Sequence, residues 1–256
     1  MRSALMLVTG LVLSSGSLAA QFAGFSGAVS QSDLLYFAGQ PRLALEVLEE
    51  HLASDATDYG ALWRAARAAV LTGLAAEDDL ERDRWLDPAL LYAQRAVASR
   101  PDGSDGLYWR GVAAGCRAMN ADARYGVALG QIVYDDAHSI LAVDSMHAGA
   151  HNMLGKLNYE IMSLSRLKRA AARLFMGNAA LKDSSWENAE YHLGRAAELW
   201  PDYVLFQFDL AQLRRKRGAN EDAVLSFQRA IDLPAVHPID AKLQVSAKTQ
   251  LGALRE

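Results

Sequence analysis

Residues Leu205–Pro234 read LFQFDLAQLRRKRGANEDAVLSFQRAIDLP and have the pattern of two helices that pack against each other. Small side chains suit the place where two helices cross closely, and a large side chain fills the gap to the next unit. A glycine marks the turn, and a proline ends the second helix. The positions that carry this pattern are Leu210, Ala211, Gly218, Ala223, Phe227, Ala230 and Pro234.

This unit resembles the tetratricopeptide repeat, a helix–turn–helix motif of about 34 residues. Gln207 and Arg214 replace two aromatic residues of its consensus. Similar units begin near residues 33, 59, 104 and 148. Apolar residues recur at intervals of three and four residues throughout, which is typical of helices, and no segment shows the alternation typical of a strand. One repeat cannot bury its own apolar face, so the sequence predicts an all-α solenoid of about four to five stacked helix pairs.

Two of the units depart from a regular spacing. In the second, we expect Gly73 to form the turn, an acidic loop to follow, and the second helix to start at Pro88. In the fourth, Leu154 and Gly155 form a clear large–small pair, but the second helix comes late, which predicts a helical insertion at about 161–185. Residues DAKLQVSAKTQLGAL near the C-terminus predict a capping helix, as solenoids require.

The first residues have the form of a secretory signal peptide, with Arg2 before a short apolar run and small residues after it. We expect residues 1–20 to be removed, 21–32 to form a flexible leader, and 33–256 to form the repeat domain. The single cysteine, Cys116, excludes an internal disulfide, and there is no N-glycosylation acceptor. We therefore expect a soluble protein of the bacterial periplasm.

The charge balance disfavours a nucleic-acid partner. The chain has 26 Lys and Arg against 30 Asp and Glu, a net charge of −4. It therefore lacks the positive field that neutralises phosphates.

Catalytic and metal-binding patterns are weak, and we expect neither an enzyme nor a metal or other cofactor. His147 and His151 stand four residues apart, which on a helix would put both rings on one face, but no third and fourth ligand is evident. An acid–histidine group has no nucleophile beside it, and the cysteine lies in an alanine-rich helix. These candidates are Asp135, Asp136, His138 and Cys116.

Three motifs resemble the tetratricopeptide family of the regulators of microtubule dynamics. A W-R-x-A-R motif falls on Trp63–Arg67, and an L-P-x5-D turn falls on Leu233–Asp240. Between them an L-S-x-x-x-R segment leads into A-A-x-L-F-G, with Met176 before the glycine, at Leu164, Ser165, Arg169, Ala171, Ala172, Leu174, Phe175 and Gly177. The resemblance implies a helical-repeat fold, an adaptor or membrane-associated role, and no catalytic residues. Microtubule association is not expected of an exported bacterial protein.

The first helix of each repeat lines the inner surface of such a solenoid. Counting from residues 59, 104, 148 and 204 predicts a groove lined by aromatic, cationic and amide side chains, which suit an extended acidic peptide or an anionic head group. We therefore expect a non-enzymatic scaffold for a peptide or protein partner; the alternative is a carrier of a lipid or other anionic amphiphile. The groove residues are Trp63, Arg67, Tyr108, Asn152, Lys156, Tyr159, Phe208, Gln212 and Arg215.

The insertion itself is amphipathic. Leu164, Leu167, Ala171 and Leu174 form an apolar stripe, and basic residues lie on the other side. One interpretation is contact with an anionic lipid, membrane surface or acidic partner through Arg166, Arg169 and Arg173. The other is a helix that packs its stripe onto the solenoid and leaves the arginines in solvent.

Overall fold

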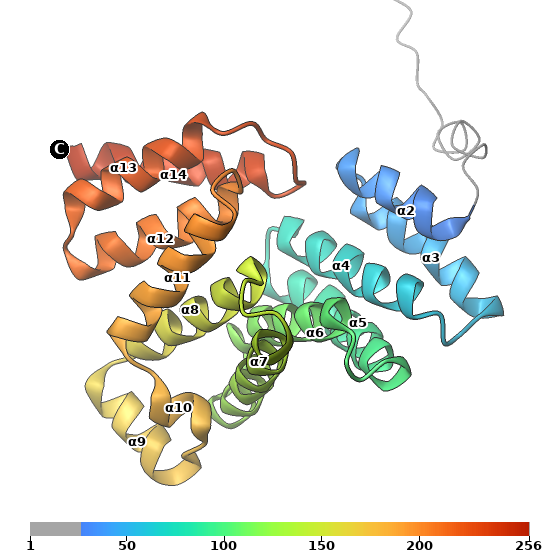
Figure 1. Ribbon diagram of the computed structural model, residues 1–256, viewed down its shortest axis with the longest axis horizontal. Coiled ribbons are helices and arrows are strands. Elements are labelled where there is room, and N and C mark those ends of the chain that lie inside the picture. Colours follow the sequence, from blue (N-terminus) through green and yellow to red (C-terminus); the bar gives the residue numbers. More distant parts are fainter. Residues whose placement is uncertain (1–26, 256) are drawn as a thin grey trace, which may run out of the picture.

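The computed structural model describes residues 27–255, except for the side chains of residues 175 and 176, and regular structure in this range is entirely helical. Within it thirteen helices follow one another, as Figure 1 shows. Their bounds are α2 Ala28–Phe37, α3 Pro41–Ser54, α4 Tyr59–Ala75, α5 Asp79–Ser99, α6 Ser104–Ala118, α7 Ala123–Val143, α8 Ala148–Ser163, α9 Arg166–Met176, α10 Ala179–Asp183, α11 Trp186–Leu199, α12 Val204–Arg217, α13 Asn220–Asp232 and α14 Asp240–Arg255.

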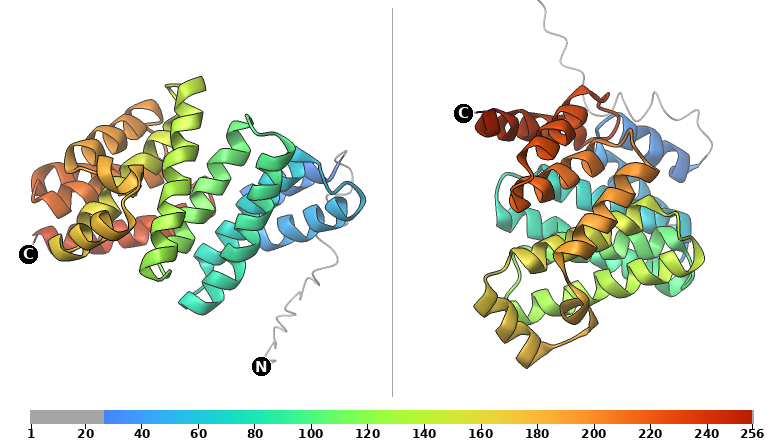
Figure 2. Two further views of the ribbon diagram at one scale, coloured as in Figure 1. Left: turned by 90° about the horizontal axis from the view of Figure 1, so that it is seen from below. Right: turned by 60° about the vertical axis from the view of Figure 1, so that its left-hand side comes forward.

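The helices form stacked pairs, which confirms the predicted solenoid. The pairs are α2 with α3, α4 with α5, α6 with α7, α8 with α11, and α12 with α13. Helix α14 packs against α13 and α12 and covers the end of the stack. Figure 2 shows the pairs side by side along a curved array. The first helices of successive repeats touch in the order α2, α4, α6, α8 and α12, so they form one row.

Small residues allow the helices to approach closely. A Cβ atom added to Gly155 of α8 would lie 2.7 Å from the backbone nitrogen of Leu193 in α11. One added to Gly111 of α6 would lie 2.1 Å from Cε of Met153 in α8. The turn glycines behave differently, because Gly39 and Gly218 have φ angles of 72° and 80° that other residues rarely adopt. Pro41 begins α3 as expected.

The prediction for the second repeat was wrong in detail. Gly73 lies inside α4, where its Cβ position would be 3.1 Å from the Arg82 carbonyl oxygen, so it permits a close crossing instead of forming the turn. The acidic stretch is the first part of α5, and Pro88 lies within that helix. The Asp78 side chain accepts a hydrogen bond from the Glu81 amide, and acids favour a helix N-terminus, which explains the early start.

The N-terminal boundary also moves. Helix α2 begins at Ala28, inside the segment predicted to be a flexible leader, and Ser32 is fully buried with its hydroxyl donating to the Val29 carbonyl. The signal peptide predicted for residues 1–20 lies outside the described residues. Within 27–255, no helix has both the length and the apolar character that crossing a bilayer requires.

The predicted insertion consists of α9 and α10, and of the two interpretations of its apolar stripe, the one in which the stripe packs onto the solenoid is wrong. Ala172 is buried, whereas Leu167 and Leu174 are 81% and 77% exposed. Arg169 and Arg173 donate to backbone carbonyl oxygens of the segments just before and after α9 in the same chain. The leucine stripe is therefore not the packing face, and of the three arginines two are engaged with the protein.

Candidate functional site

The inner row of helices carries the candidate site. The predicted starting residues of the inner helices, 59, 104, 148 and 204, are the observed first residues of α4, α6, α8 and α12. The predicted positions therefore lie on these four helices. We call the face of α4, α6, α8 and α12 that bears these residues, with the side of α2 that contacts α4, the inner surface.

At the N-terminal end of the inner surface, Arg67 is held by neighbours. It is only 9% exposed, pairs with the Asp33 carboxylate of α2, and lies over the ring of Tyr36 at 4.0 Å. Arg64 pairs with the same carboxylate at 2.9 Å and stacks on Trp63, whose ring is half-buried. Sequence reasoning missed Asp33, although it precedes Arg67 by 34 residues, which is one repeat period.

In the centre, Asp209 of α12 connects two predicted residues of α8. Its carboxylate accepts from Asn152 Nδ2 at 3.0 Å and lies 3.4 Å from Lys156 Nζ. Lys156 also lies 3.4 Å from a Glu160 carboxylate oxygen and 5.1 Å from the centre of the Tyr159 ring. Burial alone would lower the pKa of Lys156, but Asp209 and Glu160 outweigh burial and raise it. Lys156 is therefore charged and its charge is balanced.

Tyr108 of α6 lies in the row between these two groups. Its ring packs edge-on against Trp109 and beside His147. Gly149 makes room for this ring, because a Cβ there would lie 2.6 Å from Tyr108 Cε2. Burial raises the pKa of Tyr108, so the phenol stays neutral.

The residues predicted on α12 do not form one surface. Phe208 is 5% exposed and packs on Phe227, so it contributes to the core. Gln212 is half-buried and Arg215 is exposed. Arg215 belongs to four consecutive cations that close the helix, from Arg214 to Arg217. These charges favour the C-terminal end of the helix dipole.

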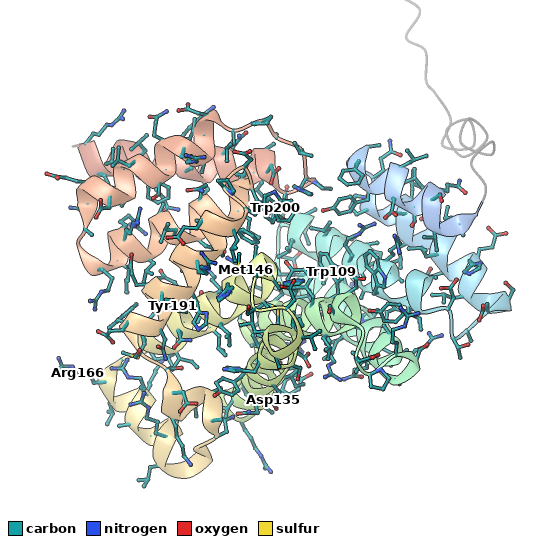
Figure 3. The ribbon with its side chains drawn as sticks, viewed as in Figure 1. Trp109, Asp135, Met146, Arg166, Tyr191 and Trp200 are labelled. Atoms are coloured by element: carbon teal, nitrogen blue, oxygen red, sulfur yellow. The ribbon has the colours of Figure 1, made fainter. Side chains whose placement is uncertain are left out.

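A contact that the sequence did not predict joins the two ends of the solenoid. The hydroxyl of Tyr36 in α2 is hydrogen-bonded to Nδ1 of His237, just before α14, at 3.0 Å. Lys242 Nζ of α14 donates to the Leu74 carbonyl of α4 at 2.8 Å. The rings of Trp200 and Tyr203 also pack beside His237. Figure 3 shows Trp200 near the middle of the molecule, where the C-terminal repeats face α4.

The other residues singled out in the sequence have structural contacts. His147 caps α8 by accepting from the Ala150 amide, so it does not share a helix face with His151 as predicted. His151 instead contacts His192 of α11. Buried Asp136 pairs with Arg110. Burial raises the pKa of the Cys116 thiol to about 11, which keeps it protonated and weakly nucleophilic.

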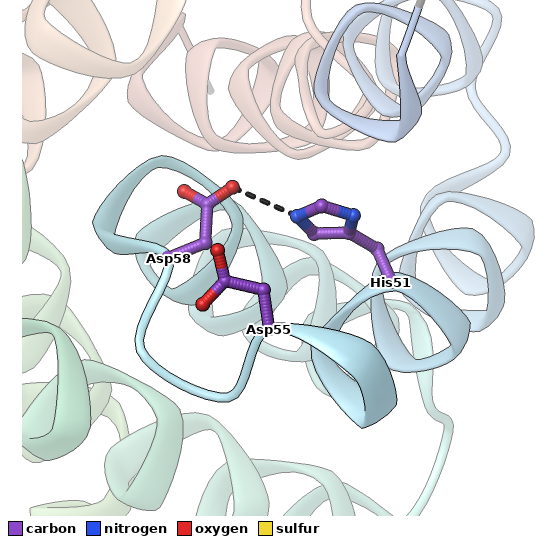
Figure 4. A group of neighbouring side chains, drawn as sticks. All are labelled: His51, Asp55 and Asp58. Carbon is purple, nitrogen blue, oxygen red and sulfur yellow. Dashed lines mark hydrogen bonds and ion pairs between the residues drawn. The ribbon is translucent and has the colours of Figure 1, made fainter.

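One group within the described residues has the composition of a metal site: His51, Asp55 and Asp58, at the turn between α3 and α4 (Figure 4). His51 Nε2 lies 2.8 Å from Asp58 Oδ2, and Asp58 Oδ1 accepts from the Ala61 amide at 3.1 Å. Burial alone would raise the pKa of Asp58, but these hydrogen bonds lower it. Both oxygens of Asp58 are thus engaged in fastening α3 to the start of α4, which accounts for the group.

Comparisons with known proteins agree with the fold. The family described as Regulator of microtubule dynamics protein 1-3 matches residues 28–255. No curated protein matches the chain. The solved thermophilic tetratricopeptide protein TTC0263 of Thermus thermophilus is 20% identical, with 88% of this chain and 97% of that chain covered and a TM-score of 0.61. YrrB, described as a tetratricopeptide protein with an unusual peptide-binding site, is 13% identical, with coverages of 92% and 98% and a TM-score of 0.41.

Proposed function

This chain belongs to the Regulator of microtubule dynamics protein 1-3 family, and from that premise we propose that it is a non-enzymatic scaffold whose inner surface binds a peptide segment of a partner protein. Its tetratricopeptide-type fold is that of a protein-interaction scaffold. Stacked repeats of this kind create extended surfaces that suit extended partners.

The observation that carries the proposal is the alternation of rings and fixed polar groups along the inner surface. Trp63, Tyr108 and Tyr159 are each half-buried, so part of each ring remains open to contact. Between them, Asp33 and Asp209 hold cationic and amide groups in place. Preformed polar groups lose little freedom on binding, and aromatic rings bury apolar side chains.

The charge balance refines the expected peptide. Lys156 already has two carboxylate partners, so the centre of the inner surface offers no uncompensated positive charge for a strongly acidic segment. At the N-terminal end, Arg64 and Arg67 share a single carboxylate. Arg215 is exposed at the end of α12 among other cations. The peptide that fits is therefore apolar and polar along its middle, with acidic residues only towards the two ends of the inner surface.

The test is a crosslinking pull-down with three variants of the full chain. Tyr159→Ala removes a ring of the inner surface, Arg215→Glu reverses the exposed charge, and Arg42→Glu on α3 is the control with an exposed arginine elsewhere. We expect the first two to lose a partner that the control retains. Retention of every partner by both variants would contradict the proposal. Arg67→Glu is unsuitable, because it would bury a second carboxylate beside Asp33.

Two further points belong to this proposal. The carrier alternative predicts that the purified chain brings an amphiphile with it. Native mass spectrometry that finds only the polypeptide mass would count against a carrier and would not affect the scaffold proposal.

The proposed location is the periplasm, and it rests only on the signal-like composition of residues 1–20. Cell fractionation with N-terminal sequencing of the mature chain tests it.

A further inference from the structure

Helix α9 presents its leucines to solvent and two of its three arginines to the protein, the reverse of a helix that covers a core. Leu167 and Leu174 are among the most exposed large apolar side chains of the described residues, and Leu164 just before the helix is 40% exposed. On a helix, residues 167 and 174 lie on one face, with Ala170 and Ala171 beside them. These residues, Leu164, Leu167, Ala170, Ala171 and Leu174, form a ridge that we call the leucine ridge.

Polar contacts on the other side of α9 hold this orientation. Arg169 Nη1 donates to the carbonyl oxygens of Met162 and Leu164, at 2.9 and 3.1 Å. Arg173 donates to the carbonyl oxygens of Leu181 and Ser184, at 2.8 and 3.0 Å. These four carbonyls belong to chain segments that end or follow helices, where carbonyl groups lack partners within the helix. Turning the leucines inward would break all four hydrogen bonds.

The charge around the leucine ridge is of one sign. Residues 163–178 contain four cations and no acidic residue, although the whole chain has a net charge of −4. Arg166 and Lys168 are exposed and flank the ridge on its two sides. Figure 1 places α9 at one extremity of the molecule, far from α2 and α4, and Figure 3 shows Arg166 at the outer edge. A flat surface can therefore reach the ridge without meeting the rest of the solenoid.

We propose that the leucine ridge docks the protein on the surface of a membrane that contains anionic lipids. The leucines would enter the boundary between head groups and acyl chains, and Arg166 and Lys168 would extend sideways to the phosphates. A protein partner fits less well. A stable protein interface buries at least about 1,200 Å² in total, which one exposed helix face about 16 Å long with two prominent leucines does not supply.

A second copy of the chain is also a poor occupant, because two ridges would bring their cations together. The inner surface and the leucine ridge lie on different helices, so docking through α9 leaves the proposed peptide site free. Docking would then place a scaffold and its partner beside the membrane. This inference does not depend on the proposed peptide binding.

The experiment is cosedimentation of the full chain with vesicles made of equal parts phosphatidylcholine and phosphatidylglycerol, or of phosphatidylcholine alone. The test variant is Leu167→Ser with Leu174→Ser, and the control is Leu225→Ser, which changes a leucine that is 68% exposed on α13. Because the replaced side chains are exposed, the helical circular dichroism should stay unchanged. A second variant, Arg166→Gln with Lys168→Gln, removes the flanking charge and keeps the leucines.

We expect the wild type to bind the anionic vesicles, and the double serine variant to bind them roughly a hundredfold more weakly. The double glutamine variant should lose most of the difference between anionic and neutral vesicles, and added salt should weaken wild-type binding. The proposal is wrong if the wild type does not bind anionic vesicles, even if a protein is found to bind α9. It is also wrong if the double serine variant binds like the Leu225→Ser control.

Discussion

The Nδ1 atoms of His151 and His192 lie 2.9 Å apart across the contact between α8 and α11. Nε2 of His151 lies 3.1 Å from the Ser145 carbonyl oxygen, which can only accept a hydrogen bond. A neutral His151 therefore carries its proton on Nε2, its Nδ1 accepts, and Nδ1–H of His192 donates. His151 must be neutral, because a proton on its Nδ1 would leave two donors facing each other.

We expect acid to weaken this contact. Burial lowers the pKa of His151, and burial together with His151 and His138 lowers that of His192 to about 4. An unfolded histidine titrates near 6.5, so the unfolded chain binds a proton first. The stabilisation of the fold by the neutral histidine pair is complete above about pH 6.5 and is lost as the pH falls towards about 4. The shift of His192 corresponds to ~3 kcal/mol, which its partial exposure reduces to about 2 kcal/mol. Urea unfolding across this pH range measures the loss.

The matched variant is His192→Gln. It removes the titrating group, so its stability should fall less steeply with acid than that of the wild type. Subtracting the two curves removes the contribution of carboxylates common to both chains. Parallel curves between about pH 6.5 and pH 5 would show that the histidine pair does not carry the effect.

Removing the Asp209 carboxylate should destabilise the junction between the fourth and fifth repeats. Asp209→Ala leaves Asn152 without its acceptor and Lys156 without a buried counter-charge, and we expect a cost of about 3 kcal/mol in the free energy of unfolding. Asp209→Asn keeps an acceptor and should cost less. The control, Asp202→Ala, changes an exposed acid whose ion pair with Arg229 should contribute less than about 0.5 kcal/mol. Equal losses in Asp209→Ala and Asp202→Ala would refute this assignment.

The repeat pattern was enough to predict the helix pairs and the first residues of four inner helices, because the spacing of small and large residues follows the packing directly. It did not predict the acids that hold the site. Asp33 and Asp209 reach residues 34 and 57 positions away, on other helices, and no local pattern signals such pairs. The role of a glycine is equally hard to predict from sequence. Gly73 allows two helices to cross closely, whereas Gly218 adopts the positive φ angle of a turn.

The orientation of α9 shows another limit. Its sequence defines two faces, and the amphipathic pattern allowed both a helix that packs its apolar stripe onto the solenoid and one that leaves the stripe for another surface. Here the C-terminal ends of the neighbouring helices α8 and α10 offer carbonyl oxygens, and Arg169 and Arg173 donate hydrogen bonds to them. The choice between the two faces depends on what lies next to the helix in space, which the pattern within residues 164–177 does not contain.

The contact between Tyr36 and His237 should restrain the two ends of the solenoid. Tyr36→Phe removes the hydroxyl that bonds Nδ1 of His237, so we expect a loss of about 1 kcal/mol and faster amide hydrogen exchange in α2 and at the start of α14. Tyr191→Phe is the control, because Tyr191 is exposed on α11. Unchanged exchange in Tyr36→Phe would mean that the Lys242–Leu74 bond and the surrounding rings suffice to hold the ends together.

Two glycines that differ in their surroundings allow a direct test of the close crossing of α8 and α11. A Cβ at Gly155 would lie 2.7 Å from the Leu193 backbone nitrogen, whereas a Cβ at Gly194 meets nothing within 4 Å. Both residues lie inside helices, where alanine is preferred to glycine by up to about 1 kcal/mol. Gly155→Ala should therefore destabilise the chain by roughly 2 kcal/mol, because the helices must move apart.

Gly194→Ala should instead stabilise it by about 0.5–1 kcal/mol, because the unfolded chain loses freedom and no contact is strained. Denaturant unfolding of both variants measures the two effects against the same wild type. Opposite signs are required, since helix propensity alone would make both changes stabilising. If Gly155→Ala were as stable as Gly194→Ala, α8 and α11 would not cross as closely as the structure places them.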